Sequence, residues 1–227
     1  MTADASAAPT GRPPVRAVAG RPRGRPRKDA DPAPADDVLA AALHAFAIHG
    51  YQGVSVRTLN RELGVSHNLL HQRFGSKEAI WYAAVDWGFG GLVEQLARAD
   101  DDRADPLDRL RVFIRTFVAF NARHPDLVRV ANAEGGQPTE RLDYLLDNYV
   151  RPTIERTSPI VEQLVAAGRL KDVSRAAIYF LVTSGAGAMY SNDAMTRALF
   201  SADVLALERV DEYADGVATI ILDGLTR

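Results

Sequence analysis

The sequence predicts an all-α protein with a small helix-turn-helix unit near its N-terminus and a larger helical domain behind it. Three observations predict this class. Apolar residues recur at three- and four-residue spacing along most of the chain after residue 36. Serine and aspartate stand where helices would begin, and glycine or proline where they would end. Hydrophobic residues make up 47% of the 227 residues, which is enough to build a sizeable core.

Residues 1–35 form a basic arm of low complexity. Seven arginine and lysine residues oppose three aspartates there, a net charge of +4 that leaves −6 for the rest of a chain whose total is −2. This composition predicts disorder in isolation and an anionic partner at one end of the molecule. The tandem Gly-Arg-Pro-Arg repeat of residues 20–27 resembles an AT-hook, in which an extended backbone enters an A·T minor groove; the residues that would do so are Arg23, Gly24, Arg25, Pro26 and Arg27. The alternative is a solvated tail that binds any phosphate backbone.

The first predicted helix begins at Asp36 and Asp37, which favour the positive end of a helix dipole, and ends at Gly50. The segment SVRTLNRELGVSHNLLHQRFGSK, residues 55–77, then indicates two short helices joined by a tight turn. Ser55 is expected to cap the first helix, Gly64 to end it in the left-handed conformation, and Ser66 to cap the second. The outward side chains of the second helix would be His67, Asn68, His71 and Gln72. Compact polar side chains on a short second helix are typical of a helix-turn-helix that reads a DNA major groove.

Residues 41–80 resemble the DNA-binding domain of the tetracycline-repressor (TetR) family of bacterial regulators. The features that match, in order and spacing, are Phe46, Gly50-Tyr51, Ser55, Leu59, Leu63-Gly64-Val65-Ser66, Leu70, Phe74 and Ser76-Lys77-Glu78. Two positions depart from the pattern: Asn60 replaces a small apolar residue, and His71 replaces the usual tyrosine of the recognition helix.

A fourth helix is expected to begin at Ser76 and to run past Trp87 towards Gly90-Gly91. The resemblance implies that this helix connects the DNA-binding unit to a regulatory core. It also implies phosphate contacts from Ser55 and from Lys77, with Arg57 and Thr58 close by. Each of these side chains has the plainer alternative of an exposed polar residue.

The C-terminal domain is expected to be a helical bundle. One helix starts near Leu107 and is broken at His124-Pro125, and a short one ends at Gly135-Gly136. A long helix after Leu142 should be kinked by Pro152, and a fresh segment should start at Ser158-Pro159 and end at Gly168. Two final helices are predicted over about residues 173–190 and 203–225.

The TetR resemblance implies two further features of this domain. The last two helices would pair with those of a second copy to form a homodimer, although their apolar stripes alone also fit an intramolecular core. The middle helices would surround a cavity for a small, mainly apolar effector. The candidate lining residues are Phe117, Phe120, Asn121, Leu127, Val130, Tyr149, Phe180 and Thr183.

Several kinds of site have no support in the sequence. The chain has no cysteine, and neither a signal peptide nor a membrane span is evident, which favours a soluble, cytoplasmic protein without a membrane partner. His67 and His71 have a metal-ligand spacing, but no acidic or cysteine partner is near, so no metal is expected. We find no nucleophile–base pair, carboxylate dyad or phosphate loop, and therefore expect neither an enzyme nor a cofactor.

The domain prediction is a basic arm over 1–35, a helix-turn-helix domain over 36–80, and a ligand-binding and dimerisation domain over 81–227. The predicted function is sequence-specific transcription regulation: a homodimeric repressor binds a double-stranded operator and leaves it when a small-molecule effector binds. The alternative is a ligand-independent architectural protein that binds DNA with the arm and the helix-turn-helix together.

Overall fold

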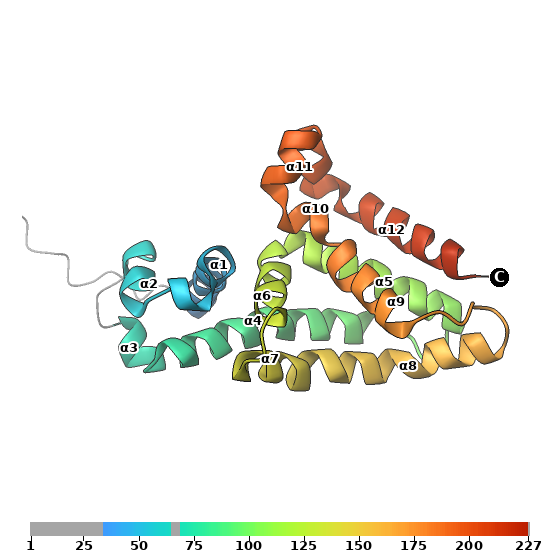
Figure 1. Cartoon of the computed structure of the whole chain (residues 1–227), viewed down its shortest axis with the longest axis horizontal. Coiled ribbons are helices and arrows are strands. Elements are labelled where there is room, and N and C mark those ends of the chain that lie inside the picture. The colour runs from blue at the N-terminus through green and yellow to red at the C-terminus, as the bar shows by residue number, and fades with distance from the viewer. Residues whose placement is uncertain (1–33, 65–68, 227) are drawn as a thin grey trace, which may run out of the picture. The chain divides into compact units, whose positions relative to one another are not determined.

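A computed structural model describes residues 34–64 and 69–226 (Figure 1). Within these ranges every regular element is a helix, apart from one isolated bridge between Leu170 and Thr226. None of the helices in the same ranges is long and apolar enough to cross a membrane.

The N-terminal helices follow local rules that are visible in the sequence. They are α1 (Ala35–Gly53), α2 (Val56–Glu62), α3 (Leu69–Phe74) and α4 (Lys77–Ala99). Gly50 interrupts α1 with a φ of +67°, and Gly64 follows α2 with a φ of +63°. Ser76 caps α4, because its side-chain oxygen accepts a hydrogen bond of 3.1 Å from the Ala79 N–H.

The remaining helices form the C-terminal domain. Its first part consists of α5 (Pro106–Arg123), α6 (Pro125–Gly135), α7 (Glu140–Leu145), the π-helical turn η1 (Leu146–Val150) and α8 (Arg151–Ala166). Its second part consists of α9 (Arg175–Phe180), the π-helical turn η2 (Leu181–Gly185), α10 (Ala188–Ser191), α11 (Asp193–Leu199), the 3-10 turns η3 (Ala202–Leu205) and η4 (Leu207–Arg209), and α12 (Val210–Leu225).

The expected new helix at Ser158-Pro159 is wrong, since α8 runs through Pro159 without a break. Pro159 is exposed, so water can hydrate the carbonyl of Glu155 that a proline cannot bond. The turn η1 precedes Pro152, and the Arg151 N–H bonds to the Leu146 carbonyl five residues back. The wider helical turn accommodates the proline that was expected to cause a kink.

Two further boundaries differ from the expectation. The last α-helix begins at Val210 rather than near residue 203, because the preceding residues form the turns η3 and η4. Between the two predicted final helices lies α11, which the apolar pattern did not reveal. Its exposed side chains include Met195 and Leu199, so it has no buried stripe to recognise.

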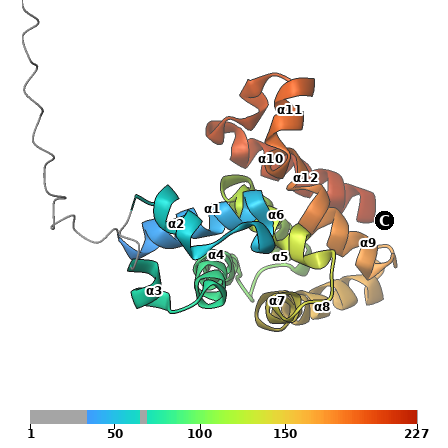
Figure 2. The ribbon, with the colours of Figure 1, turned by 60° about the vertical axis from the view of Figure 1, so that its left-hand side comes forward.

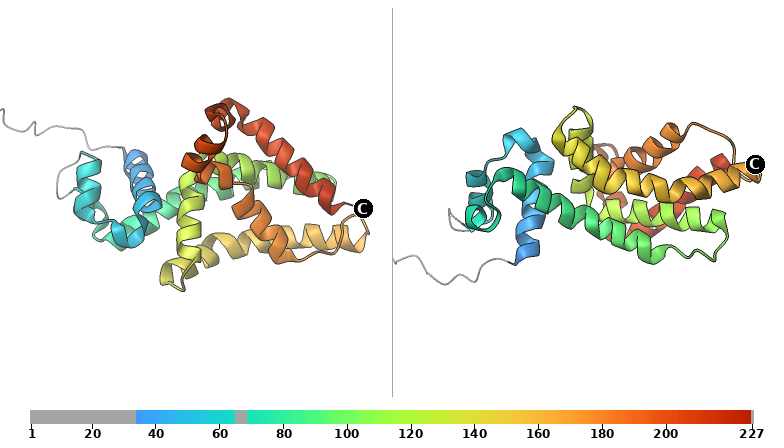
Figure 3. Two further views of the ribbon diagram at one scale, coloured as in Figure 1. Left: turned by 45° about the horizontal axis from the view of Figure 1, so that its top comes forward. Right: turned by 90° about the horizontal axis from the view of Figure 1, so that it is seen from below.

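Two buried clusters hold the described helices together. In one of them, α4 packs against α1 and α6 (Figure 2), with Phe46, Leu70 and Trp81 among the fully buried side chains. In the other, α5 contacts both α8 and α12 (Figure 3), and Leu164 and Leu222 are fully buried. The helix α4 therefore connects the helix-turn-helix with α5 and α6 of the C-terminal domain.

Candidate nucleic-acid interface and cavities

The start of α2 presents a set of polar groups. The Ser55 side chain accepts a hydrogen bond of 3.0 Å from the Thr58 N–H, and the two hydroxyl oxygens lie 2.8 Å apart. Arg57 is exposed beside them. The cap predicted for Ser55 is confirmed, and it fixes the end of α2 that would approach a phosphate.

The described part of the second helix, α3, has one buried and one exposed face. Leu70 is fully buried, whereas His71, Gln72 and Arg73 are exposed. His71 and Gln72, the two predicted contact residues of this helix that the structure describes, are therefore exposed to solvent as expected. The other predicted contacts lie outside the described residues: Ser66, His67, Asn68 and the arm residues Arg23, Gly24, Arg25, Pro26 and Arg27.

Lys77 does not stand free beside α3. Its ammonium lies 4.1 Å from the ring centre of Tyr51, and the guanidinium carbon of Arg141 lies 3.8 Å from the same centre. Burial lowers the pKa of Lys77, and the charge of Arg141 lowers it further. Arg141 is itself held by Glu134, whose Oε1 lies 2.9 Å from its Nε. Tyr51 on α1 is thus in contact with two cations, Lys77 at the start of α4 and Arg141 on α7.

Sequence reasoning did not single out Arg73 or Arg141. Arg73 is an exposed cation on α3, and its place on the outer face follows from the same periodicity that selected His71. Arg141 is ninety residues from Tyr51 in the chain, so no local pattern could have paired them.

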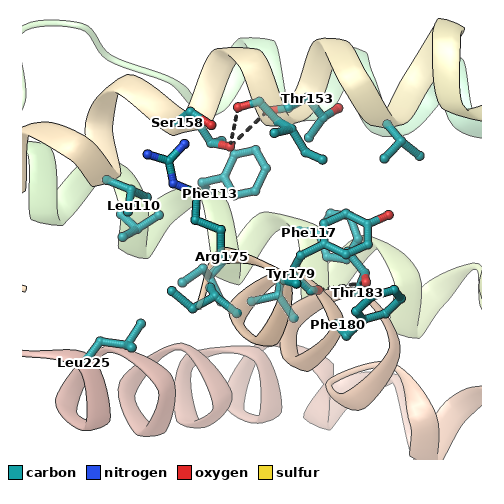
Figure 4. Close-up of a pocket in the computed structure, with 18 of the residues that line it drawn as sticks. Leu110, Phe113, Phe117, Thr153, Ser158, Arg175, Tyr179, Phe180, Thr183 and Leu225 are labelled. Atoms are coloured by element: carbon teal, nitrogen blue, oxygen red, sulfur yellow. Dashed lines mark hydrogen bonds between the residues drawn. The ribbon is translucent and has the colours of Figure 1, made fainter. Parts of the chain in front are cut away.

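The C-terminal domain contains two apolar cavities. The proximal cavity, of about 550 Å³, lies between α4, α5, α6, α7 and η2, and its walls include Phe89, Leu127 and Tyr149. The distal cavity, of about 430 Å³, lies between α5, α8, α9 and the end of α12 (Figure 4), and its walls include Phe113 and Arg175. Both volumes fall within the range of small-molecule sites.

Most of the candidate effector residues line these cavities. Phe117, Phe180 and Thr183 line both, and the proximal cavity adds Asn121, Leu127 and Tyr149. Phe120 and Val130 line neither: they are 5% and 3% exposed and belong to the core around α4. The reason is helical geometry, because neighbouring positions on an apolar stripe face different partners.

One polar cluster joins the proximal cavity to α4. The Asp86 carboxylate on α4 accepts hydrogen bonds of 2.6 Å from the Tyr149 hydroxyl and 2.7 Å from the Tyr144 hydroxyl. Burial and the bond to Asp86 raise the pKa of Tyr144 to about 12 and the pKa of Tyr149 further. Tyr149 lines the proximal cavity, so this hydrogen bond connects the cavity wall with the helix that carries the helix-turn-helix.

Two family models match the chain. Residues 38–84 match the model of bacterial regulatory proteins of the tetR family, and residues 106–221, about half of the chain, match a tetracyclin repressor-like C-terminal domain. The chain belongs to the TetR family. The resemblance seen in residues 41–80 is confirmed, and the second match extends the family assignment to the C-terminal domain. This TetR protein is a DNA-binding transcriptional regulator.

Relatives and solved structures agree with this assignment. The HTH-type transcriptional repressor NicS of Pseudomonas putida is 20% identical over 197 residues, which span 85% of this chain and 92% of NicS. The nucleoid occlusion factor SlmA of Vibrio vulnificus is 24% identical over 154 residues, spanning 61% and 79% of the two chains.

Two solved TetR-type regulators share the fold. The ketosteroid transcriptional regulator KstR2 of Mycobacterium tuberculosis has a TM-score of 0.64 at 19% identity, covering 84% of this chain and 94% of KstR2. PfmR of Thermus thermophilus has a TM-score of 0.63 at 24% identity, covering 84% and 96%. These relatives are regulators, and the helical fold with an N-terminal helix-turn-helix is shared with them.

Proposed function

We propose that this TetR protein is a homodimeric repressor that a small, mainly apolar ligand releases from its operator. The observation that carries the proposal is the hydrogen bond from Tyr149 to Asp86, because it ties a cavity wall to α4. A ligand that displaces Tyr149 would break this hydrogen bond and allow α4 to shift. The positions of α2 and α3, which precede α4, would shift with it. The name of NicS, a repressor, is in line with repression.

The proposed DNA contacts are the exposed groups at the start of α2 and on α3. Ser55, Arg57 and Thr58 would bind phosphates, and His71, Gln72 and Arg73 would face base edges or the adjacent backbone. Lys77 would contribute positive charge from its place over Tyr51. The proposal extends to Ser66, His67 and Asn68 in the segment that the structure does not describe.

The proposed dimer face consists of the outer sides of α12 and η2. On α12 the exposed positions Gly216, Ile220 and Gly224 recur every fourth residue, and Ile220 is 74% exposed. Leu181 on η2 is 53% exposed. The Tyr213 hydroxyl donates a hydrogen bond of 2.6 Å to the Ala186 carbonyl, which fastens α12 to the end of η2. Small residues beside exposed apolar ones allow the close approach of a second pair of helices.

The test begins with the DNA. Genomic fragments that bind the full-length protein are selected and sequenced, and the affinity for the best fragment is measured by fluorescence anisotropy with and without a panel of apolar compounds. We expect a site of two half-sites and at least one compound that lowers the affinity. The proposal fails if no fragment is selected over bulk DNA, and a site whose affinity no compound changes would favour the ligand-independent architectural alternative.

A further inference from the structure

The two cavities lie side by side and share part of their walls. Phe117, Val150 and Thr183 are among several residues that line both the proximal and the distal cavity. Because the two cavities adjoin at these side chains, a long ligand that displaced them would extend from one cavity into the other. A ligand of that shape has a long apolar body, because the walls consist mainly of aliphatic and aromatic side chains.

The formal charge in the walls of the two cavities is confined to the distal one. Among the described residues that line the two cavities, Arg175 alone carries a formal charge; the polar remainder consists of hydroxyl and amide groups. In Figure 4 the guanidinium of Arg175 extends from α9 towards Ser158 on α8. Two adjoining apolar cavities with a cation in the wall of one of them suit an amphipathic anion.

Arg175 has donors available for such a ligand. Its Nη2 lies 2.8 Å from Oε1 of Glu162, and the two side chains are 66% and 56% exposed. An ion pair this exposed is weak, and a guanidinium has five N–H donors. The Ser158 hydroxyl, on the same wall, makes no hydrogen bond within the described part of the chain. One planar guanidinium fork beside one hydroxyl matches a carboxylate, whereas a phosphate ester with two charges would call for more than one cation.

We propose that the effector is a long-chain carboxylate, with its carboxylate at Arg175 and Ser158 and its hydrocarbon chain running through the distal cavity into the proximal one. This inference rests on the proposed function and adds the chemical class and orientation of the ligand. The chain end would then lie beside Tyr149, at the point that is joined to α4.

The head group is tested by calorimetry with dodecanoate and its methyl ester, each below its aggregation concentration. We expect the full-length protein to bind the acid about tenfold more tightly than the ester, the size of effect expected for a charge-assisted hydrogen bond. Arg175→Gln should lower the affinity for the acid by about the same factor and leave the ester within about twofold. Arg98→Gln is the matched control, since Arg98 is an equally exposed arginine paired with Glu94 on a helix but away from both cavities.

The orientation is tested by chain length. Affinity should rise from octanoate to dodecanoate to tetradecanoate, and Val150→Phe, which narrows the junction, should abolish the gain for the longer acids while leaving octanoate binding intact. Thr153→Val, at the same junction but nearly unchanged in volume, should retain the gain. Far-ultraviolet circular dichroism confirms that each variant is folded.

The outcomes separate this inference from the proposed function. Equal binding of acid and ester, or an acid preference that survives Arg175→Gln, would overturn the carboxylate assignment. The proposed function would still stand in that case if some other apolar ligand released the protein from its operator. If neither compound binds and no apolar compound changes operator affinity, both fail together.

Discussion

Asp86 links the wall of the proximal cavity to α4, the helix that follows the helix-turn-helix. Its carboxylate lies on α4 and accepts hydrogen bonds from two tyrosines, but only Tyr149 also lines a cavity; Tyr144 instead packs against Tyr82. The two hydrogen bonds are alike in length and chemistry. Removing each bond in turn therefore distinguishes an effect on stability from an effect on the response to ligand.

We predict that Tyr149→Phe and Tyr144→Phe each lower the free energy of unfolding by about 1 kcal/mol or less, since each removes one hydrogen bond to an exposed carboxylate. Only Tyr149→Phe should reduce the factor by which ligand weakens operator binding, because only Tyr149 touches the cavity. Denaturant unfolding gives the first quantity, and anisotropy titrations with and without ligand give the second. Equal reduction of ligand response in both variants would contradict the role given to Tyr149.

Asp105 is a carboxylate whose pKa is lowered in the folded protein. Its carboxylate forms two hydrogen bonds with Arg169, of 2.8 and 2.9 Å, and also accepts the Leu107 N–H at the start of α5. The bond to Arg169, followed by the backbone bond, lowers the pKa of Asp105 to about 2 from 3.8. The unfolded chain therefore takes up the proton first, so the stabilisation is fully present above pH 3.8 and is lost as the pH falls to about 2.

We predict that Asp105→Asn flattens the loss of stability between these two pH values and lowers stability at neutral pH. Urea unfolding of both proteins over this pH range measures the effect. If the variant loses stability between these pH values as steeply as the parent protein does, other carboxylates control the acid sensitivity.

At the scale of elements, α4 depends on a close approach to its neighbours. A Cβ placed on Gly88 would lie 2.5 Å from Cδ2 of Leu127 on α6 and 3.2 Å from Cδ2 of Leu43 on α1, whereas a Cβ on Gly90 meets nothing within 4 Å. Leu127 is only 1% exposed to solvent and also lines the proximal cavity, so its side chain would have to turn towards that cavity to make room.

We predict opposite effects for two alanine substitutions in α4. Gly90→Ala should stabilise the protein by up to about 1 kcal/mol through helix propensity. Gly88→Ala gains the same propensity but overpacks the core at a cost of about 1–3 kcal/mol, so the net change should be destabilising. Thermal unfolding of the two variants checks the signs, and stabilisation by Gly88→Ala would mean that the Leu127 side chain turns into the proximal cavity at little cost.

The helix α12 should carry the energy of dimerisation on one face. We predict that Ile220→Asp converts the dimer to monomer, because it places a charge where an exposed isoleucine would be buried against a second copy. Ile48→Asp, at an exposed isoleucine on α1, is the control and should leave the dimer intact. Sedimentation equilibrium of the purified variants gives the association state; a dimer that survives Ile220→Asp would place the interface elsewhere.

For the whole molecule, the prediction concerns the basic arm. Deleting residues 1–28 removes all seven cations of the arm. Operator affinity should fall, and the slope of its logarithm against log salt should become shallower by roughly 0.9 for each phosphate that the arm no longer neutralises. The effect should be larger when the sequence flanking the operator is A·T-rich. Unchanged binding to such a site would reject both the AT-hook interpretation and the nonspecific tail.

Prediction from sequence was most successful where one residue and its near neighbours decide the outcome. The caps at Ser55 and Ser76 and the left-handed conformation of Gly64 are confirmed, because cap and glycine rules act within four residues. The continuous α8 shows where such rules fail: the start signal at Ser158-Pro159 was outweighed by the packing of α8 against α5. The division of domains at residue 80 stays a prediction, and α4 spans it.

By itself, the sequence determined the all-α class, the helix-turn-helix and the family, since these depend on residue type at fixed short spacings. Only the tertiary structure decided which apolar side chains line cavities and which fill the core, and which distant groups meet, as Tyr149 meets Asp86 and Arg141 meets Tyr51. The physical reason is that a periodic pattern specifies which face of a helix is apolar. What that face contacts is set by helices far away in the chain, whose relative placement no local pattern encodes.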